Sequence, residues 1–266
     1  MEYQKFIPEG WKDEHTQFSI EGLNMAKETG EVMEGLVTKC DSNYNLYVDL
    51  GKNLTGIIPR EEVELLNLAE DGKSKPNLCI NKVNKMVQFK VKDVEEDKII
   101  LSRKDVEKDS IGWIKNDLKE GAILNGIVRN MQNYGAFVEI GGGIVGLLHI
   151  EDMSIARIKT PAERFSIGQK IDIMVKSIDK ENGRVILTHK ELLGTWEENI
   201  KNYEECSTVV GIAREVEKSK NGIFVELMPN LVGLADYRDD IEYGQKVSVF
   251  IKKILYDKRK IKLVIL

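Results

Sequence analysis

Three histidines, His15, His149 and His189, are the side chains best suited to acid–base or metal chemistry in this sequence. None of them has a carboxylate or a cysteine at metal-ligand spacing, and the sequence contains no nucleophile elbow. The glycines at 141–143 lack the Lys-Ser/Thr pair and the strand-to-helix context of a phosphate-binding loop, so we predict a hairpin turn there. The sequence therefore predicts no enzyme, no metal site and no cofactor.

The three cysteines, Cys40, Cys79 and Cys206, lie far apart and form no CxxC pair. They predict neither a disulfide framework nor a zinc site, and we interpret them as small buried side chains in a reducing compartment. The polar N-terminus lacks the apolar core of a signal peptide, and no apolar run approaches the roughly 18 residues needed to span a bilayer. We therefore expect a cytoplasmic protein with no membrane partner.

The charge balance is mildly acidic, with 39 Lys and Arg against 44 Asp and Glu and a formal net charge of -5. Because non-specific nucleic-acid binding depends on neutralising phosphates, this balance argues against a general polyanion-coating protein. A local basic or aromatic face is compatible with an acidic whole.

One pattern of short apolar strands recurs three times along the chain. The copies are anchored on Gly35, Gly126 and Gly211, which are spaced 91 and 85 residues apart. These spacings are those of domains and not of solenoid repeats. In the clearest copy, apolar residues at 171, 173 and 175 have the period of a half-buried strand, and Asn182-Gly183 favours a hairpin turn.

Each copy is predicted to form five short strands. We expect five antiparallel strands of this length, which can remove their open edges only by closing into a small barrel. The predicted fold is therefore all-β, with three tandem five-stranded barrels and short linker helices. The predicted ranges are an N-terminal segment at 1–29, domain 1 at 30–104, a linker helix at 105–118, domain 2 at 119–189, a linker helix at 190–203, and domain 3 at 204–266.

The linkers carry tryptophans at similar positions, Trp113 and Trp196, which we interpret as packing residues at the domain junctions. Both linkers have an amphipathic, helical pattern. The N-terminal segment contains a predicted helix from Ser19 to Glu28, and the stretch 153–169 is predicted to hold a short helix or a 3₁₀ turn.

The middle copy resembles the S1 RNA-binding domain family. The resemblance is carried by the motif YGAFVEIGGGIVGLLHI at 134–150, then by IGQKI at 167–171 and IDKENGRVILT at 178–188. The junction sequences LSRKDVEKDSIGW and LTHKELLGTW resemble those between successive domains of the family's bacterial ribosomal members. The resemblance covers roughly residues 30–266 and implies that the three barrels are OB-folds.

The family implies that one face of such a barrel binds single-stranded RNA. Aromatic rings offer platforms for unstacked bases, and flanking cations meet phosphates. In the middle domain the family's positions are all filled, with two aromatic residues, a histidine, and an acidic and a basic residue around the last hairpin. Together with two nearby lysines, the RNA-binding candidates are Tyr134, Phe137, His149, Asp179, Arg184, Lys176 and Lys180. A place for Phe137 in the core is the alternative.

The first and third domains depart from this pattern. In the first domain the histidine position holds Pro59, and Glu95 stands at the acidic position of the last hairpin. In the third domain Asn221 replaces the first aromatic residue, Asp236 replaces the histidine, and Asp257 keeps the acidic position. The weaker RNA-binding candidates are Tyr44, Tyr47, Lys98, Phe224 and Lys260.

The resemblance therefore predicts a non-enzymatic, single-stranded RNA-binding protein associated with mRNA or the ribosome. The N-terminal region is the part expected to dock onto the ribosome or a ribosomal protein. The alternative is a protein-interaction adapter that uses degenerate barrels and binds little RNA. A third class, an enzyme acting on RNA, needs a catalytic cluster that the sequence does not contain.

Overall fold

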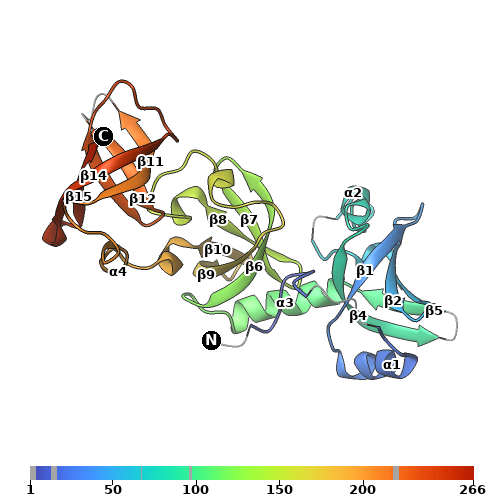
Figure 1. The fold of residues 1–266 in the computed structure, drawn as a ribbon. Helices are drawn as coiled ribbons and strands as arrows, with labels where there is room; N and C mark the ends of the chain where they lie inside the picture. The colour runs from blue at the N-terminus through green and yellow to red at the C-terminus, as the bar shows by residue number, and fades with distance from the viewer. Residues whose placement is uncertain (1–3, 13–16, 67, 96–97, 218–221) are drawn as a thin grey trace. The chain divides into compact units, whose positions relative to one another are not determined.

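The computed structural model describes residues 4–12, 17–66, 68–95, 98–217 and 222–266 (Figure 1). Its strands form three closed five-stranded barrels, which confirms the predicted fold class. The chain divides into two compact units. The first unit comprises 1–127, 138–146 and 178–185, and the second comprises 128–137, 147–177 and 186–266. The middle barrel contributes strands to both units.

The first barrel has the neighbour order β1-β2-β3-β5-β4. Alternate residues of each strand point inward, as in β2, where Leu46, Val48 and Leu50 are fully buried. Its strands are β1 (Met33–Cys40), β2 (Leu46–Gly51), β3 (Leu54–Ile58), β4 (Met86–Glu95) and β5 (Lys98–Ser102).

One neighbouring pair in this barrel, β3 and β5, runs parallel, with Ile57 opposite Ile100. The same arrangement joins the third and fifth strands of the other two barrels. The prediction of five antiparallel strands was therefore wrong for one pair per barrel. The reason is topological, because strand direction cannot alternate all the way around a closed ring with an odd number of strands.

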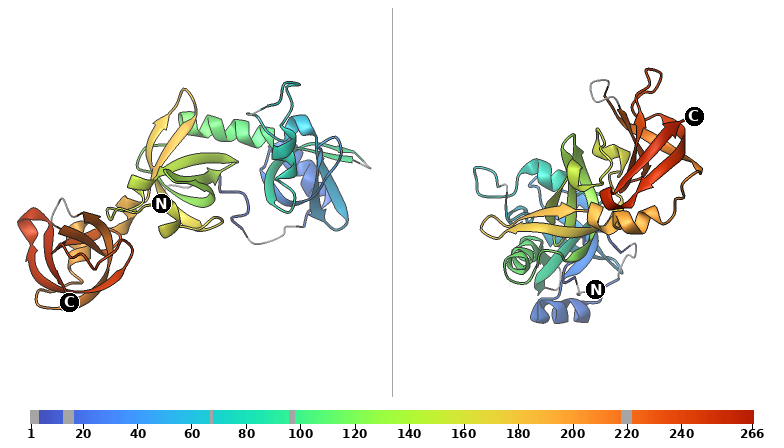
Figure 2. Two further views of the ribbon diagram at one scale, coloured as in Figure 1. Left: turned by 90° about the horizontal axis from the view of Figure 1, so that it is seen from above. Right: turned by 90° about the vertical axis from the view of Figure 1, so that its left-hand side faces the viewer.

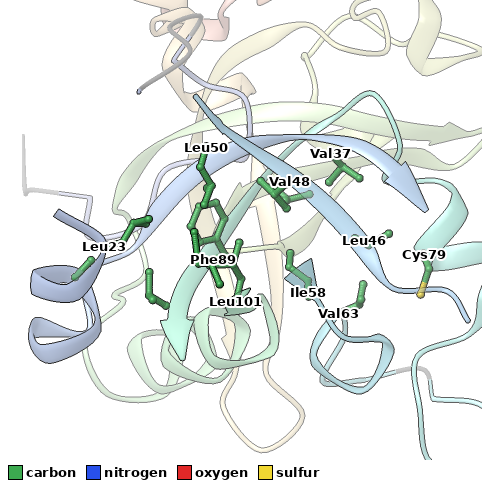
Figure 3. Packing of buried hydrophobic residues seen from close by; sticks show 14 residues of the cluster. Leu23, Val37, Leu46, Val48, Leu50, Ile58, Val63, Cys79, Phe89 and Leu101 are labelled. Carbon is green, nitrogen blue, oxygen red and sulfur yellow. The ribbon is translucent and has the colours of Figure 1, made fainter. Parts of the chain in front are cut away.

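Helix α1 (Ile20–Thr29) covers part of the first barrel and packs against β4. The Ser19 hydroxyl caps the helix by accepting a hydrogen bond from the Gly22 N–H at 3.1 Å. Leu23 of this helix joins the core, in which Phe89 is fully buried (Figure 3). The helix predicted from Ser19 to Glu28 is thus present, with its termini shifted by one residue.

The middle barrel has the neighbour order β10-β8-β7-β6-β9. The turn between its second and third strands lies at 142–143, as the sequence predicted for the three glycines. Its strands are β6 (Ile123–Gln132), β7 (Gly135–Gly141), β8 (Ile144–His149), β9 (Lys170–Asp179) and β10 (Arg184–Thr188). Two 3₁₀ helices, η2 (Ile150–Asp152) and η3 (Pro161–Glu163), lie between β8 and β9.

The third barrel, drawn orange to red in Figure 2, has the order β11-β12-β13-β15-β14. Its strands are β11 (Thr208–Glu217), β12 (Gly222–Met228), β13 (Leu231–Asp236), β14 (Lys246–Leu255) and β15 (Lys260–Ile265). The strands of all three barrels lie within the predicted ranges 30–104, 119–189 and 204–266. The domain boundaries themselves stay a prediction. Short helices outside the linkers include η1 (Arg60–Glu62), α2 (Pro76–Ile80) and η6 (Tyr256–Lys258).

The two linkers differ from one another. The first contains one helix, α3 (Lys104–Asn116), which buries Trp113 against Phe6 at a ring-centroid distance of 5.8 Å. The prediction of a single helix over 190–203 was wrong, because η4 (Lys190–Leu193) and α4 (Trp196–Ile200) are separate. Gly194 lies between them at φ +80°, which helical residues do not adopt, and Thr195 caps the second helix.

The cysteines are free, and only one matches the prediction of a buried thiol. Cys79 is buried, and burial raises its pKa to about 11, which keeps the thiol protonated. Cys40 is half-buried and Cys206 is exposed. Among the described residues, no helix is both long enough and apolar enough to cross a membrane.

A buried ionic cluster joins the N-terminal segment to the first barrel and α3. Arg103 is 3% exposed and donates to Glu9 at 2.7 Å, with Glu64 at 3.2 Å and Glu107 also in contact. Burial opposes ionisation of Glu9, but attraction from Arg103 and Lys82 lowers its pKa to about 2. Arg103 thus carries the positive charge that lets these carboxylates remain buried.

Replacing Arg103 by Met is expected to lower the free energy of unfolding of this unit by about 3–5 kcal/mol, because buried carboxylates lose their cation. The matched control is Arg259→Met, which removes an exposed pair with Glu197 and should cost less than about 1 kcal/mol. Urea unfolding followed by tryptophan fluorescence measures both. Similar losses in the two variants would show that the cluster contributes no more than a surface pair.

Glu107 should make the stability of this unit depend on pH. Burial raises the pKa of Glu107 from 4.5 to about 7, with Arg103 opposing and Glu64 reinforcing this effect. Between these values the folded state holds a proton that the unfolded state has released, so the free energy of unfolding falls as pH rises. Urea midpoints measured at about pH 5 and pH 8 should therefore differ more in the wild type than in Glu107→Gln. An equal difference in the two proteins would exclude Glu107 as the cause.

Candidate nucleic-acid interface

Two aromatic rings lie together on the surface of the middle barrel. Tyr134 occupies the turn before β7 and is 50% exposed, and Phe137 is the one β7 residue that is not buried. Their centroids are 6.2 Å apart and their planes meet at 84°. Because Tyr134 lies in the turn, the alternation of the strand does not separate the two rings.

Gly135 allows the turn to pack closely. A Cβ atom at this position would lie 2.6 Å from the carbonyl oxygen of Leu148, which no larger residue could tolerate without a shift. The Ile150 N–H donates to the carbonyl oxygen of Tyr134 at 2.9 Å. The turn that carries Tyr134 is therefore fixed to the end of β8.

His149 ends β8 and caps η2. Its Nδ1 atom accepts a hydrogen bond from the Glu151 N–H at 3.4 Å, and its side chain is 39% exposed. Since Ile150 is bonded to Tyr134, the histidine and the two rings sit on directly connected segments. We refer to Tyr134, Phe137 and His149 as the aromatic face.

Lys176 on β9 does not project freely. Its Nζ atom lies 2.8 Å from both carboxylate oxygens of Asp152, and Lys190 Nζ lies 2.9 Å from Oδ1 of the same carboxylate. Asp152 is only 4% exposed. Sequence reasoning identified Lys176 but missed Asp152 and Lys190. The signal that could have found them is the repeat itself, because the first domain has Glu62 and Lys92 in the same relation.

The hairpin residues Asp179, Lys180 and Arg184 are exposed and belong to the first unit, whereas Tyr134, Phe137, His149 and Lys176 belong to the second. The Asp179 carboxylate accepts from Asn182 Nδ2 at 2.7 Å and from the Asn182 N–H at 3.1 Å. These hydrogen bonds lower the pKa of Asp179. Asp179 therefore closes the turn that presents Lys180 and Arg184.

In the first barrel, each ring of the aromatic pair has a cationic side chain of the same barrel lying over it. Tyr44 is half-buried, packs against the core cluster and lies 5.3 Å from the Arg60 guanidinium. The Tyr47 ring has Lys39 Nζ at 5.5 Å, and its hydroxyl lies 3.4 Å from Asp41. Lys98 is exposed at the start of β5, and Pro59 precedes η1.

The third barrel keeps one ring of the pair. Phe224 on β12 is half-buried and lies opposite Leu234, which is 46% exposed. Lys260 and Asp236 are both exposed, and Asn221 lies outside the described residues. A carboxylate at the position of His149 would repel RNA phosphates.

No group of three or more His, Cys, Asp or Glu side chains in the described residues is placed to hold a metal ion. The chemistry that the described site offers within the second unit is therefore stacking and hydrogen bonding by the aromatic face, with cations from Lys176 and Lys190.

Comparisons with known proteins identify relatives over most of the chain. The model of the S1 RNA binding domain family matches residues 26–104 and 117–190. The small ribosomal subunit protein bS1 of Staphylococcus epidermidis is 32% identical over 264 residues, which cover 93% of this chain and 64% of that protein. The protein of the same name from Staphylococcus aureus is 30% identical with the same coverage. The chain thus spans about 64% of the length of these relatives.

Among solved structures, the solution structure of GSP13 from Bacillus subtilis is 28% identical and has a TM-score of 0.28. That match covers 30% of this chain and 61% of GSP13.

The position of Phe137 outside the core can be tested by measuring the free energy of unfolding of alanine variants. Phe137→Ala is expected to lower the free energy of unfolding by about 1 kcal/mol, because the ring is only partly buried. The control Phe165→Ala removes a ring that is 6% exposed and should cost about 3–5 kcal/mol. If thermal or urea unfolding shows that Phe137→Ala and Phe165→Ala lose equal free energy of unfolding, Phe137 belongs to the core.

Proposed function

Because the chain belongs to the S1 RNA-binding domain family, we propose that it binds single-stranded RNA through the aromatic face of its middle barrel. The observation that carries this proposal is the edge-to-face pair of Tyr134, which is 50% exposed, and Phe137, the one β7 residue that is not buried. Rings that reach the surface offer stacking platforms for unpaired bases, each worth about 1–3 kcal/mol when stacked.

Electrostatics supports the same face. Of the exposed candidate cations, Lys176 on β9 belongs to the same unit as the aromatic face, whereas Lys180 and Arg184 belong to the other unit. Contacts of such cations with phosphates release counterions, so binding should weaken as salt increases. The chain as a whole carries a charge of -5, which makes a localised site necessary for attraction of RNA.

The middle barrel is proposed to supply most of the affinity. In the first barrel Arg60 and Lys39 already cover the faces of Tyr44 and Tyr47. In the third barrel Asp236 stands where the middle barrel has His149. Linked barrels still raise the effective RNA concentration for one another, so weaker barrels extend the contact once the middle barrel has bound.

The finer proposal is that the RNA is mRNA and that the protein acts at the ribosome in the cytoplasm. It is supported by relatives named small ribosomal subunit protein bS1. The N-terminal region is the proposed docking element. Its segment 4–10 is fixed in place, because Gln88 Nε2 donates to the Ile7 carbonyl oxygen at 3.0 Å and Arg103 bonds Glu9.

The direct test is fluorescence anisotropy with a labelled single-stranded RNA of about 15 nucleotides, titrated with the full chain at two salt concentrations. Binding should be micromolar or tighter at low salt and should weaken at high salt. Phe137→Ala and His149→Ala should each weaken binding by about tenfold, because a stacking or hydrogen-bonding partner is lost. The matched control Phe224→Ala in the third barrel should change the affinity by less than about twofold.

Two results would contradict the proposal. Equal losses for Phe137→Ala and Phe224→Ala would mean that the barrels share binding evenly. Absence of binding at low salt would favour the alternative, an adapter whose barrels contact proteins. An adapter would instead co-purify with a stoichiometric protein partner.

A further inference from the structure

Asp152 is a buried carboxylate between two lysines, three residues after His149. Lys176 Nζ lies 2.8 Å from each of its oxygens, and Lys190 Nζ lies 2.9 Å from Oδ1. The Asp152 side chain is 6% exposed, whereas those of Lys176 and Lys190 are 48% and 31% exposed. The carboxylate thus lies beneath two ammonium groups that remain accessible to solvent.

Asp152 is held in its ionised form by this arrangement. Burial alone would raise the pKa of Asp152, but the hydrogen bonds from Lys176 and Lys190 lower it below its ordinary value. With the carboxylate charged, the three side chains together carry one net positive charge. An ionised carboxylate in such a place is stable only with its cations, so it fixes both ammonium groups close together.

The two ammonium groups retain hydrogen-bonding capacity. Each has three N–H donors. Lys176 donates to both carboxylate oxygens of Asp152. Lys190 donates to Oδ1 of Asp152 and to the Glu151 carbonyl oxygen at 3.2 Å. A free lysine loses side-chain conformational entropy when it is immobilised by a ligand. Since Asp152 has already restricted both lysines, an anion that binds them incurs less of that loss.

The first barrel has a related group with a different charge balance. Glu62 accepts from Lys92 Nζ at 2.8 Å, and Lys104 attracts it electrostatically. The registers of the two barrels make these residues the counterparts of Asp152, Lys176 and Lys190. Lys92 also lies 3.9 Å from Asp105, so two carboxylates accompany the two lysines there.

In the middle barrel the counterpart of Asp105 is Glu191, which accepts a hydrogen bond from the Thr188 hydroxyl. The third barrel has Leu266 at the position of Lys190, and its counterpart of Asp152, Asp239, is exposed. In the described part of the chain, the arrangement of two lysines on one buried carboxylate therefore belongs to the middle barrel.

We propose that Lys176 and Lys190, positioned by Asp152, form a binding site for a backbone phosphate of single-stranded RNA. Lys190 lines a groove together with Ile150, Glu151 and Arg157. Ile150 directly follows His149, so this phosphate site adjoins the aromatic face along the chain. The inference rests on the proposed RNA binding and adds to it Lys190 and a positioning residue, Asp152.

The decisive variant is Asp152→Asn, assayed by the RNA anisotropy titration with the full chain. It makes the protein more positive by one charge, so simple charge attraction predicts tighter binding. The phosphate site predicts the opposite, because the lysines are no longer held. We expect the dissociation constant to rise by about fivefold, the equivalent of one phosphate contact.

Two control variants change the charge by the same amount. Glu242→Gln neutralises an exposed carboxylate between β13 and β14 of the third barrel and should leave binding unchanged or slightly tighter. Glu62→Gln alters the related group of the first barrel and should leave the affinity within about twofold of the wild type. Circular dichroism and thermal unfolding establish that each variant is folded.

Lys190→Gln tests the site even if Asp152→Asn does not fold. In Lys190→Gln the buried Asp152 keeps Lys176 as its cation, so this variant should remain folded. Loss of one phosphate contact should reduce the slope of log affinity against log salt by about 1. The control Lys258→Gln, at an exposed site on the last hairpin of the third barrel, should leave the slope unchanged.

The outcomes separate this inference from the proposed function. Weaker binding by Asp152→Asn, with a reduced slope for Lys190→Gln, supports the phosphate site. Wild-type binding combined with equal or tighter binding by Asp152→Asn and an unchanged slope for Lys190→Gln overturns the phosphate site alone. If the wild-type chain binds no RNA at low salt, the proposed function fails and the phosphate site fails with it.

Discussion

Closure of five short strands into a ring is the constraint on which the rest of this structure depends. An open sheet of this size would expose unpaired backbone groups at its edges, and closure removes them. Because the ring has an odd number of strands, one neighbouring pair must run parallel, and in all three barrels it is the third and fifth strands. Once the ring is closed, the two-residue period of each strand decides which side chains enter the core.

The candidate site consists of side chains that the two-residue period leaves outside the core. In β7, Ala136 and Val138 enter the core, and Phe137 between them is left on the outside. Tyr134 adds a second ring from the turn, whose position is fixed by the hydrogen bond to Ile150. Both rings of the aromatic face therefore stay outside the fully buried core of the barrel. The same barrel carries a buried carboxylate, Asp152, whose two lysines reach the surface.

Repeats and local signals in the sequence predicted the barrels and the hairpins, whereas the aromatic candidates came from the resemblance to the S1 family. Ser19 before an apolar periodic stretch and Asn182-Gly183 between two strands act over a short range, and the repeated pattern at Gly35, Gly126 and Gly211 showed that the same domain occurs three times. The break of the second linker helix was missed even though Gly194 and the capping residue Thr195 are both local signals. The amphipathic pattern of 190–203 favours a continuous helix, but Gly194 at φ +80° interrupts it.

The features that the sequence did not reveal depend on residues far apart in the chain. Arg103 pairs with Glu9 across 94 residues, and Lys176 and Lys190 meet Asp152 across 24 and 38 residues. Side chains of this kind are ordinarily solvated, so their types alone indicate a charged surface. Only the folded chain brings them together, and comparison of equivalent positions between repeats is the sequence signal that could have found the Asp152 group.

The most direct test of the account is an NMR titration of the uniformly ¹⁵N-labelled full chain with single-stranded RNA. The account predicts that the largest amide shift changes fall at 134–137 and 149–152, with smaller changes in the first and third barrels. Changes confined to the first or third barrel, with the amides at 134–137 and 149–152 unaffected, would contradict the claim that RNA binds the aromatic face of the middle barrel.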